Sequence, residues 1–313
     1  MRDIWTERLN EGVAALQTGA EFELDRIIAL PGFHAAAHRA TLAERNRRID
    51  DPVLFKASHD LGRYLAWAFA AYLDATPDGV THASLTRALD EAGAASRGRA
   101  RVTLLFLQAI GYITPRPRGE DGRERRYALT PVMARAIISH YRRILDGAAP
   151  VMAPAARALS LLDEPAFLRL YGAAQGEIML RTLKTVQRPD GPSLDLYIRR
   201  AGGLHLLSHL ATSGEAGDDF PPTRPMALSV SAMARDSAIS RAQVRRLLTD
   251  SEAAGFVRRE PDDRLTVTPL LGQHIIWWTA IRFYSADLAA RIALGRWDEA
   301  KTLSSAGPSN DRG

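Results

Sequence analysis

The feature of this sequence that most constrains its fold is an internal repeat. Residues 96–113 align with residues 240–257 at a constant shift of 144 positions, with six identities in eighteen pairs and no gap. The identical pairs are Ser96/Ser240, Arg97/Arg241, Arg101/Arg245, Leu104/Leu248, Ala109/Ala253 and Gly111/Gly255. Further along, the shift falls to 138, where residues 129–131 (Leu-Thr-Pro) pair with residues 267–269 (Val-Thr-Pro). A repeat that keeps its register indicates that one supersecondary unit occurs twice.

Each copy predicts a helix, a turn, a second helix and then a two-stranded hairpin. Short helical stretches at 84–89 and 229–234 lead through turn residues to Ser96 and Ser240, which are good N-caps for the next helix. A glycine, Gly111 or Gly255, ends that helix, and aromatic and β-branched residues typical of strands follow. Proline after the closing threonine marks the start of another helix. The predicted fold class is therefore mainly α with small β-hairpins, an α+β arrangement.

This pattern resembles the winged helix-turn-helix family, and particularly the MarR-like regulators, over roughly residues 58–145 and 202–288. The resemblance rests on a Ser-Arg recognition helix ending in Gly-aromatic-aliphatic, and on a wing that has an acidic-x-Arg tip at 121–123 and closes with Leu-Thr. It implies transcription regulation through double-stranded DNA. Members usually carry one module per chain and dimerise. Two modules in one chain suggest a fused, pseudo-two-fold dimer, so we expect a monomer that acts as a pseudodimer, or a homodimer.

The resemblance also implies which residues contact DNA. Recognition helices read base edges in the major groove, while wing arginines suit phosphates or a narrow minor groove. The recognition-helix candidates are Ser96, Arg97, Arg99, Arg101, Ser240, Arg241, Gln243, Arg245 and Arg246. The wing candidates are Arg116, Arg118, Arg123, Arg125, Arg126, Arg258, Arg259 and Arg264. Residues 96–127 hold eight arginines and three acids, or +5, and residues 240–268 hold six and five, or +1. The first copy is therefore expected to dominate the electrostatic attraction.

The two copies differ on the outer side of the second helix. Val102, Leu105 and Phe106 in the first copy correspond to Arg246, Thr249 and Asp250 in the second. An apolar face there predicts either packing against another part of the chain or contact with a partner, which would make the two DNA-reading surfaces inequivalent. The alternative is that the helix is rotated and these residues lie elsewhere.

The rest of the chain is expected to be helical. The predicted segments are an N-terminal helical segment (1–50), a first module (51–150), a helical connector (151–200), a second module (201–290), and a helix end with a disordered tail (291–313). The net charge of +5 and pI of about 9.7 favour polyanionic partners without proving one. Without a signal peptide, an apolar run of about eighteen residues or any cysteine, we expect a cytoplasmic protein with no membrane association and no thiol chemistry.

Helices outside the modules often form an effector pocket in MarR-like proteins, so the resemblance implies a small-molecule effector. By that analogy Trp67, Phe167, Tyr171 and Met179 are candidate lining residues, although packing in the core is the simpler interpretation. The adjacent Trp277 and Trp278 point in different directions on a helix, so one of them can face a cleft or the other repeat.

Little in the sequence supports metal binding or catalysis. His34/His38 and His205/His209 have the i, i+4 spacing of metal ligands, but no third ligand is identified, so no metal and no cofactor is predicted. The sequence lacks HExxH, a phosphate-binding GxxxxGK[ST], GxSxG and GxGxxG, so we predict that the chain is not an enzyme. Two alternatives to a ligand-responsive regulator remain open. One is a plasmid-type replication initiator, and the other is a protein-binding scaffold of winged helices.

Overall fold

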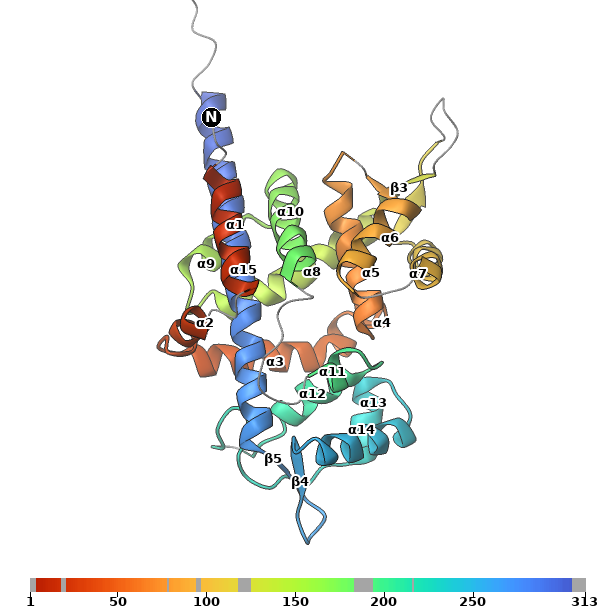
Figure 1. The fold of residues 1–313 in the computed structure, drawn as a ribbon, viewed down its shortest axis with the longest axis vertical. Helices are drawn as coiled ribbons and strands as arrows, with labels where there is room; N and C mark the ends of the chain where they lie inside the picture. Colours follow the sequence, from red (N-terminus) through yellow and green to blue (C-terminus); the bar gives the residue numbers. More distant parts are fainter. Residues whose placement is uncertain are drawn as a thin grey trace, which may run out of the picture.

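The computed structural model describes residues 4–17, 21–77, 79–93, 97–117, 125–182, 194–215 and 217–305. The protein is mainly helical and carries small antiparallel hairpins, which confirms the predicted fold class at that level (Figure 1). Within the described residues, no helix is long and apolar enough to cross a membrane.

The first repeat lies in a unit of alternating helices and short strands. Its elements in order are α5 (Leu61–Asp74), β1 (Val80–Thr81), α6 (His82–Glu91), α7 (Arg97–Ala109), β2 (Ile113–Pro115), β3 (Arg126–Leu129) and α8 (Pro131–Ala148). β3 is the central strand and pairs antiparallel with both neighbours, so that Val80 lies opposite Tyr127 and Ile113 opposite Leu129. Helix α6 begins with a capping box in which Thr81 and Ser84 exchange hydrogen bonds. We call this segment the first unit.

The second repeat has the same order of elements and is called the second unit. It comprises α12 (Gly203–Ala211), α13 (Val230–Ser237), α14 (Arg241–Ala253), β4 (Val257–Arg259), β5 (Leu265–Val267) and the start of α15 (Pro269–Ser305). Met226 forms a bridge to Leu265 on β5, in the place that β1 takes in the first unit. The element order predicted from the repeat is therefore present in both copies.

The two units also share their helix-ending contacts. Gly111 and Gly255 have positive φ angles of 73° and 72°, a conformation that glycine adopts at little cost. The next residue in each unit, Tyr112 or Phe256, donates its backbone N–H at 2.8 Å to a carbonyl in the last turn. In both units the threonine that closes the hairpin then donates its hydroxyl to the glycine carbonyl, at 2.5 Å in the first and 2.7 Å in the second. The repeat therefore extends from sequence to atomic contacts.

The remaining helices form a frame that holds the two units. They are α1 (Ile4–Gln17), α2 (Glu21–Ile28), α3 (Phe33–Asp50), α4 (Pro52–Ala57), α9 (Ala153–Leu161), α10 (Pro165–Thr182) and α11 (Asp195–Ile198). Helix α3 lies across the molecule, with the second unit below it and the first unit to the upper right (Figure 1). One large hydrophobic core joins the first unit to the frame, and a second, smaller core lies within the second unit and α11.

Helix α15 connects these parts. It begins directly after the second hairpin, passes the expected domain boundary at residue 290 without a break and runs beside α1 (Figure 1). Trp277 packs against the large core and Trp278 against the small core, so the two side chains do point in different directions. The tail expected to be disordered lies from residue 306 onward outside the described residues.

Candidate functional site

Helix α14 of the second unit presents a cationic face. Its N-cap is Ser240, whose hydroxyl accepts the Gln243 backbone N–H at 3.1 Å, as predicted. The helix buries Val244, Leu247 and Leu248 against the unit's own core. The opposite face exposes three arginines, Arg241, Arg245 and Arg246. The helix is therefore anchored on one side while its guanidinium groups extend into solvent on the other.

None of these three arginines is neutralised within the described part of the chain. No carboxylate forms an ion pair with Arg241, Arg245 or Arg246, and their side chains make no hydrogen bond there. Arg200 lies beside these arginines and forms an ion pair with Asp250 of α14. A shallow hollow lined by Arg200, Ser240 and Arg246 lies at the first turns of α14. This arrangement can bind an anionic partner without first breaking ion pairs at these three arginines.

Gln243, a predicted base-reading residue, is already engaged within the unit. Its side-chain amide donates at 3.0 Å to the backbone carbonyl of Ala201, and the residue is only partly exposed. Reading an adenine would require this hydrogen bond to break. The geometry therefore favours a positioning role for Gln243, and leaves the arginines as the accessible donors on α14.

The arginines of the second hairpin are paired with nearby acids. The ion pairs are Arg258 with Glu260, at 2.9 Å, Arg259 with Asp263 and Glu252, at 2.6 and 4.0 Å, and Arg264 with Asp262, at 2.6 Å. Hydrogen bonds from Thr266 and Arg258 also lower the pKa of Glu260, so that this carboxylate stays charged. The predicted positive charge of the wing is thus largely compensated by acids in the second unit. The uncompensated positive charge of this unit lies on α14.

Helix α7 of the first unit has a different surface. Arg97 and Arg99 lie in its first turns and Arg101 is exposed, while Ser96 is outside the described residues. Val102 and Leu105 are 67% and 55% exposed. The predicted apolar outer face is therefore present at these two residues, which no described segment covers. Phe106, the third residue expected there, instead packs against the large core with Arg63 over its ring.

The first hairpin carries both paired and unpaired arginines. Arg116 forms an ion pair with Asp74 at 3.5 Å, whereas Arg125 and Arg126 are exposed and make no ion pair with any described residue. Arg118 and Arg123, and with them the acidic-x-Arg tip, lie outside the described residues. The greater electrostatic weight expected of the first copy therefore stays a prediction.

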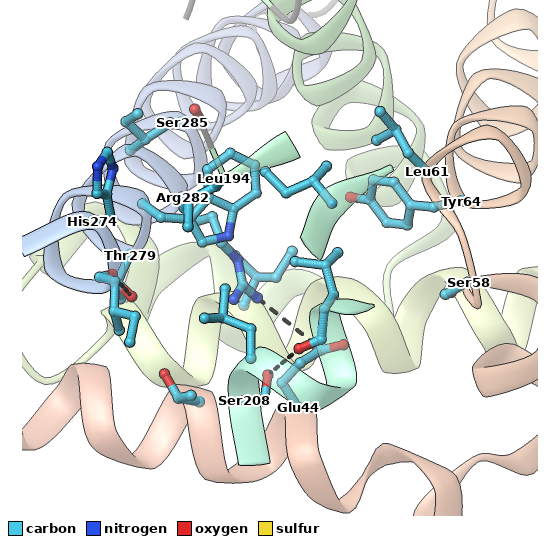
Figure 2. Close-up of a pocket in the computed structure, with 18 of the residues that line it drawn as sticks. Glu44, Ser58, Leu61, Tyr64, Leu194, Ser208, His274, Thr279, Arg282 and Ser285 are labelled. Atoms are coloured by element: carbon cyan, nitrogen blue, oxygen red, sulfur yellow. Dashed lines mark hydrogen bonds and ion pairs between the residues drawn. The ribbon is translucent and has the colours of Figure 1, made fainter. Parts of the chain in front are cut away.

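The structure contains a cavity that the sequence did not locate. It has a volume of about 210 Å³ and lies between α3, α5, α8, α10, α12 and α15. Glu44, Tyr64 and Arg282 line it from α3, α5 and α15 (Figure 2). Both tryptophans of α15 also line it. Of the lining residues suggested by analogy, only Met179 is among them, whereas Trp67, Phe167 and Tyr171 are fully buried in the core.

The paired histidines have packing roles. His38 stacks on the ring of Phe220, and the His34 ring contacts the Phe220 carbonyl at 3.2 Å. The His205 ring packs at a tilt of 33° against Phe55, with ring centroids 4.2 Å apart. The described residues contain no group of three or more histidine and acidic side chains that could hold a metal ion.

Comparisons of the chain with family models, with curated proteins and with solved structures found no match. The functional argument therefore rests on the sequence and geometry given above.

Proposed function

We propose that this protein is a sequence-specific, double-stranded DNA-binding transcription regulator built from two winged helix-turn-helix modules of MarR-like type. In this proposal α14 is a recognition helix that enters the major groove, and the hairpin that follows it is a wing. The cationic face of α14 carries the proposal. Exposed guanidinium groups that lack internal partners offer bidentate donors for guanine and for phosphates.

The position of α14 within its unit supports this assignment. A recognition helix must be fixed by its buried face, because a mobile helix would lose the entropy of ordering when it binds. Val244, Leu247 and Leu248 provide that anchor. Arg241 and Arg245 are four residues apart and so share one face of the helix, with Arg246 beside them. Three cationic side chains can then engage bases and phosphates in one groove.

The two units are proposed to contact DNA unequally. Their strand pairs, β2–β3 and β4–β5, lie toward different ends of the molecule, one at the upper right and one at the bottom (Figure 1). Two major-groove contacts one helical turn apart would need both recognition helices on one side. The second unit is therefore the proposed site of sequence reading, and the first unit is proposed to add phosphate contacts through Arg125 and Arg126.

One observation favours a second function for the first unit. Val102 and Leu105 are exposed on α7, where a helix in the major groove would carry polar side chains. Such a face suits contact with another protein, as in the scaffold alternative. Replacement of both residues by serine separates the two functions. If this variant keeps its DNA affinity but no longer binds a protein partner, α7 is assigned to protein contact.

The test of the proposed function is selection of bound sequences from random duplex DNA. The selected duplex and a scrambled control are then titrated at physiological salt, and specific regulators discriminate by at least about 10³-fold. Inverted half-sites would support a regulator and direct repeats an initiator. Absence of any enriched sequence would refute specific DNA recognition.

A matched pair of variants locates the contact. Arg245→Ala should cost about 1–3 kcal/mol on the selected site and relax the preference at one base position. Arg142→Ala is the control, since Arg142 is an exposed arginine on α8 that pairs with Asp163 at 2.8 Å, away from α14. Equal affinities of the two variants would contradict the assignment of α14.

A further inference from the structure

The central cavity lies on the boundary between the two hydrophobic cores. Leu207 and Ile275 line it from the small core of the second unit, and Ile144 and Ile281 line it from the large core. The cavity is thus a space between two separately packed bodies, in contact with both. A molecule bound there touches the second unit and the frame at once.

The charged side chains that line the cavity leave one positive charge in excess, because three arginines face two carboxylates, and Asp195 is paired with Arg199 at 3.0 Å. Glu44 accepts a hydrogen bond from Arg47, which is 2% exposed, and forms a longer ion pair of 3.9 Å with Arg282. Burial alone would raise the pKa of Glu44, but Arg47, Arg282 and Arg143 together hold it below its usual value. The carboxylate is therefore ionised and already compensated by Arg47. Among the described residues Arg282 has only this long ion pair, and Figure 2 shows it reaching in from α15.

The hydrogen bonds around His140 point a donor into the same space. Burial lowers the pKa of His140 well below its usual value, so the ring is neutral. Arg47 can only donate, and at 3.4 Å it faces Nδ1, which must accept. Nε2 therefore carries the hydrogen and donates to the Tyr64 oxygen at 3.2 Å. The hydroxyl hydrogen of Tyr64 is left with the Met179 sulfur at 4.0 Å, a weak acceptor.

Gln175 adds a polar group with unused capacity. It is 7% exposed, it lines the cavity, and its side-chain oxygen has no hydrogen-bond partner in the described chain. Unpaired polar groups at such burial cost stability unless a ligand or water engages them. The amide can turn either end toward a ligand, since its oxygen and nitrogen are nearly isosteric.

Much of the remaining lining surface is apolar, although serine and threonine side chains and the Asp195–Arg199 ion pair also contribute to it. Leu61, Met179, Trp277 and Trp278 contribute apolar or aromatic surface. The cavity volume of about 210 Å³ suits a small ligand.

We propose that this cavity binds a small monocarboxylate with an apolar body, whose carboxylate pairs with Arg282 and whose body packs against Trp277 and Trp278. A cation would face the arginine excess, and a neutral molecule would leave Arg282 with only its long ion pair to Glu44 among the described residues. Tyr64 supplies a second donor. If the proposed DNA-binding function holds, occupancy sets the placement of the second unit, and with it of α14, relative to the frame.

The binding test uses octanoate as the probe, with octanamide and octylammonium as comparators that share its alkyl chain. Isothermal titration calorimetry on the full chain should give one octanoate site, with octanamide roughly tenfold weaker or more because it lacks the charge-assisted hydrogen bond. Octylammonium should not bind. Absence of octanoate binding, or equal affinity for octanoate and octylammonium, would overturn the proposal.

Variants assign the site. Arg282→Met keeps most of the stem and should weaken octanoate binding by roughly tenfold or more, whereas the matched surface variant Arg142→Met should leave it unchanged. Circular dichroism establishes that each variant is folded. Tyr64→Phe removes no charge and gives an independent reading: a several-fold loss supports the assigned donor, and unchanged affinity contradicts it.

The regulatory part is measured separately, by titrating the selected DNA with and without saturating octanoate. A changed DNA affinity supports coupling, and an unchanged one refutes it. If the chain binds octanoate but no specific DNA sequence, the ligand site is supported and the proposed regulator is refuted. If it binds specific DNA but not octanoate, the regulator is supported and the ligand site is refuted.

Discussion

Protonation of His205 should destabilise the protein as the pH falls. The side chain lies on α12 where the second unit meets α4, is 3% exposed, and has no hydrogen-bond partner on either ring nitrogen in the described chain. Burial lowers its pKa to about 4, Glu44 opposes that shift, and Arg47 and His59 add to it. The ordinary pKa of histidine is about 6.5, so the unfolded chain takes up this proton first.

The magnitude follows from these two pKa values. Because the unfolded state binds more protons below pH 6.5, the free energy of unfolding falls from there toward pH 4 and then levels off. The full difference of about 2.5 pKa units is worth roughly 3.4 kcal/mol, and about 2 kcal/mol of it is lost between pH 7 and pH 5. That is a large part of the 5–15 kcal/mol that stabilises an ordinary domain.

Urea unfolding at pH 7 and pH 5 measures this loss, with tryptophan fluorescence and circular dichroism as probes. His205→Phe keeps an aromatic ring against Phe55 and removes the titration. The wild type should therefore lose about 2 kcal/mol more than this variant between the two pH values. His82→Gln, at an exposed histidine, is the control and should behave as the wild type does. Equal pH dependence in the His205 variant and the wild type would refute the reasoning.

Three further predictions concern packing, capping and DNA contact. Gly176→Ala places a methyl group 2.4 Å from the Cβ of Tyr72 on α5, so it should lower the free energy of unfolding in urea by about 1–3 kcal/mol. The control, Gly272→Ala, lies in open space on α15 and should be neutral or stabilising. Ser240→Ala removes the N-cap of α14 and should cost about 1 kcal/mol in the same assay, and an unchanged midpoint would deny that the cap contributes. Arg125→Ala should weaken all DNA sequences alike and reduce the salt dependence by about one unit of slope, and a loss confined to one sequence would assign it to base reading instead.

The parts of the fold that could be predicted from the sequence depend on local chemistry. Gly111 and Gly255 end their helices because glycine readily adopts the positive φ that the chain needs there. Pro131 and Pro269 begin the next helices because a proline lacks only an N–H that the first turn leaves unpaired anyway. Such rules act over a few residues, so a repeated sequence gave the same elements twice.

The cavity could not be predicted because its polar residues come from distant helices. Glu44 and Arg47 have the i, i+3 spacing that usually indicates an exposed ion pair on a helix surface. Only the packing of α8, α12 and α15 over α3 buries this pair and brings Tyr64 and Arg282 to it. The sequence signal of a surface salt bridge and that of a buried charge cluster are the same, and the tertiary fold distinguishes them.

The continuity of α15 gives the proposed ligand a physical route from the cavity to the second unit. The helix begins two residues after β5 ends, and Trp277, Trp278 and Arg282 follow within its first four turns, about 20 Å along the axis. Its later turns pack beside α1 and α10 in the frame. Because an unbroken helix transmits a tilt along its length, a ligand that draws Arg282 toward its carboxylate also acts on the hairpin at the helix start. Interruption of α15 between the two by Thr279→Pro should therefore abolish any effect of octanoate on DNA affinity, even where a residual octanoate site remains. Coupling that survives this break would instead assign the effect to α3, through the hydrogen bond of Arg48 to the Arg235 carbonyl and that of Arg45 to Thr212, at 3.2 Å.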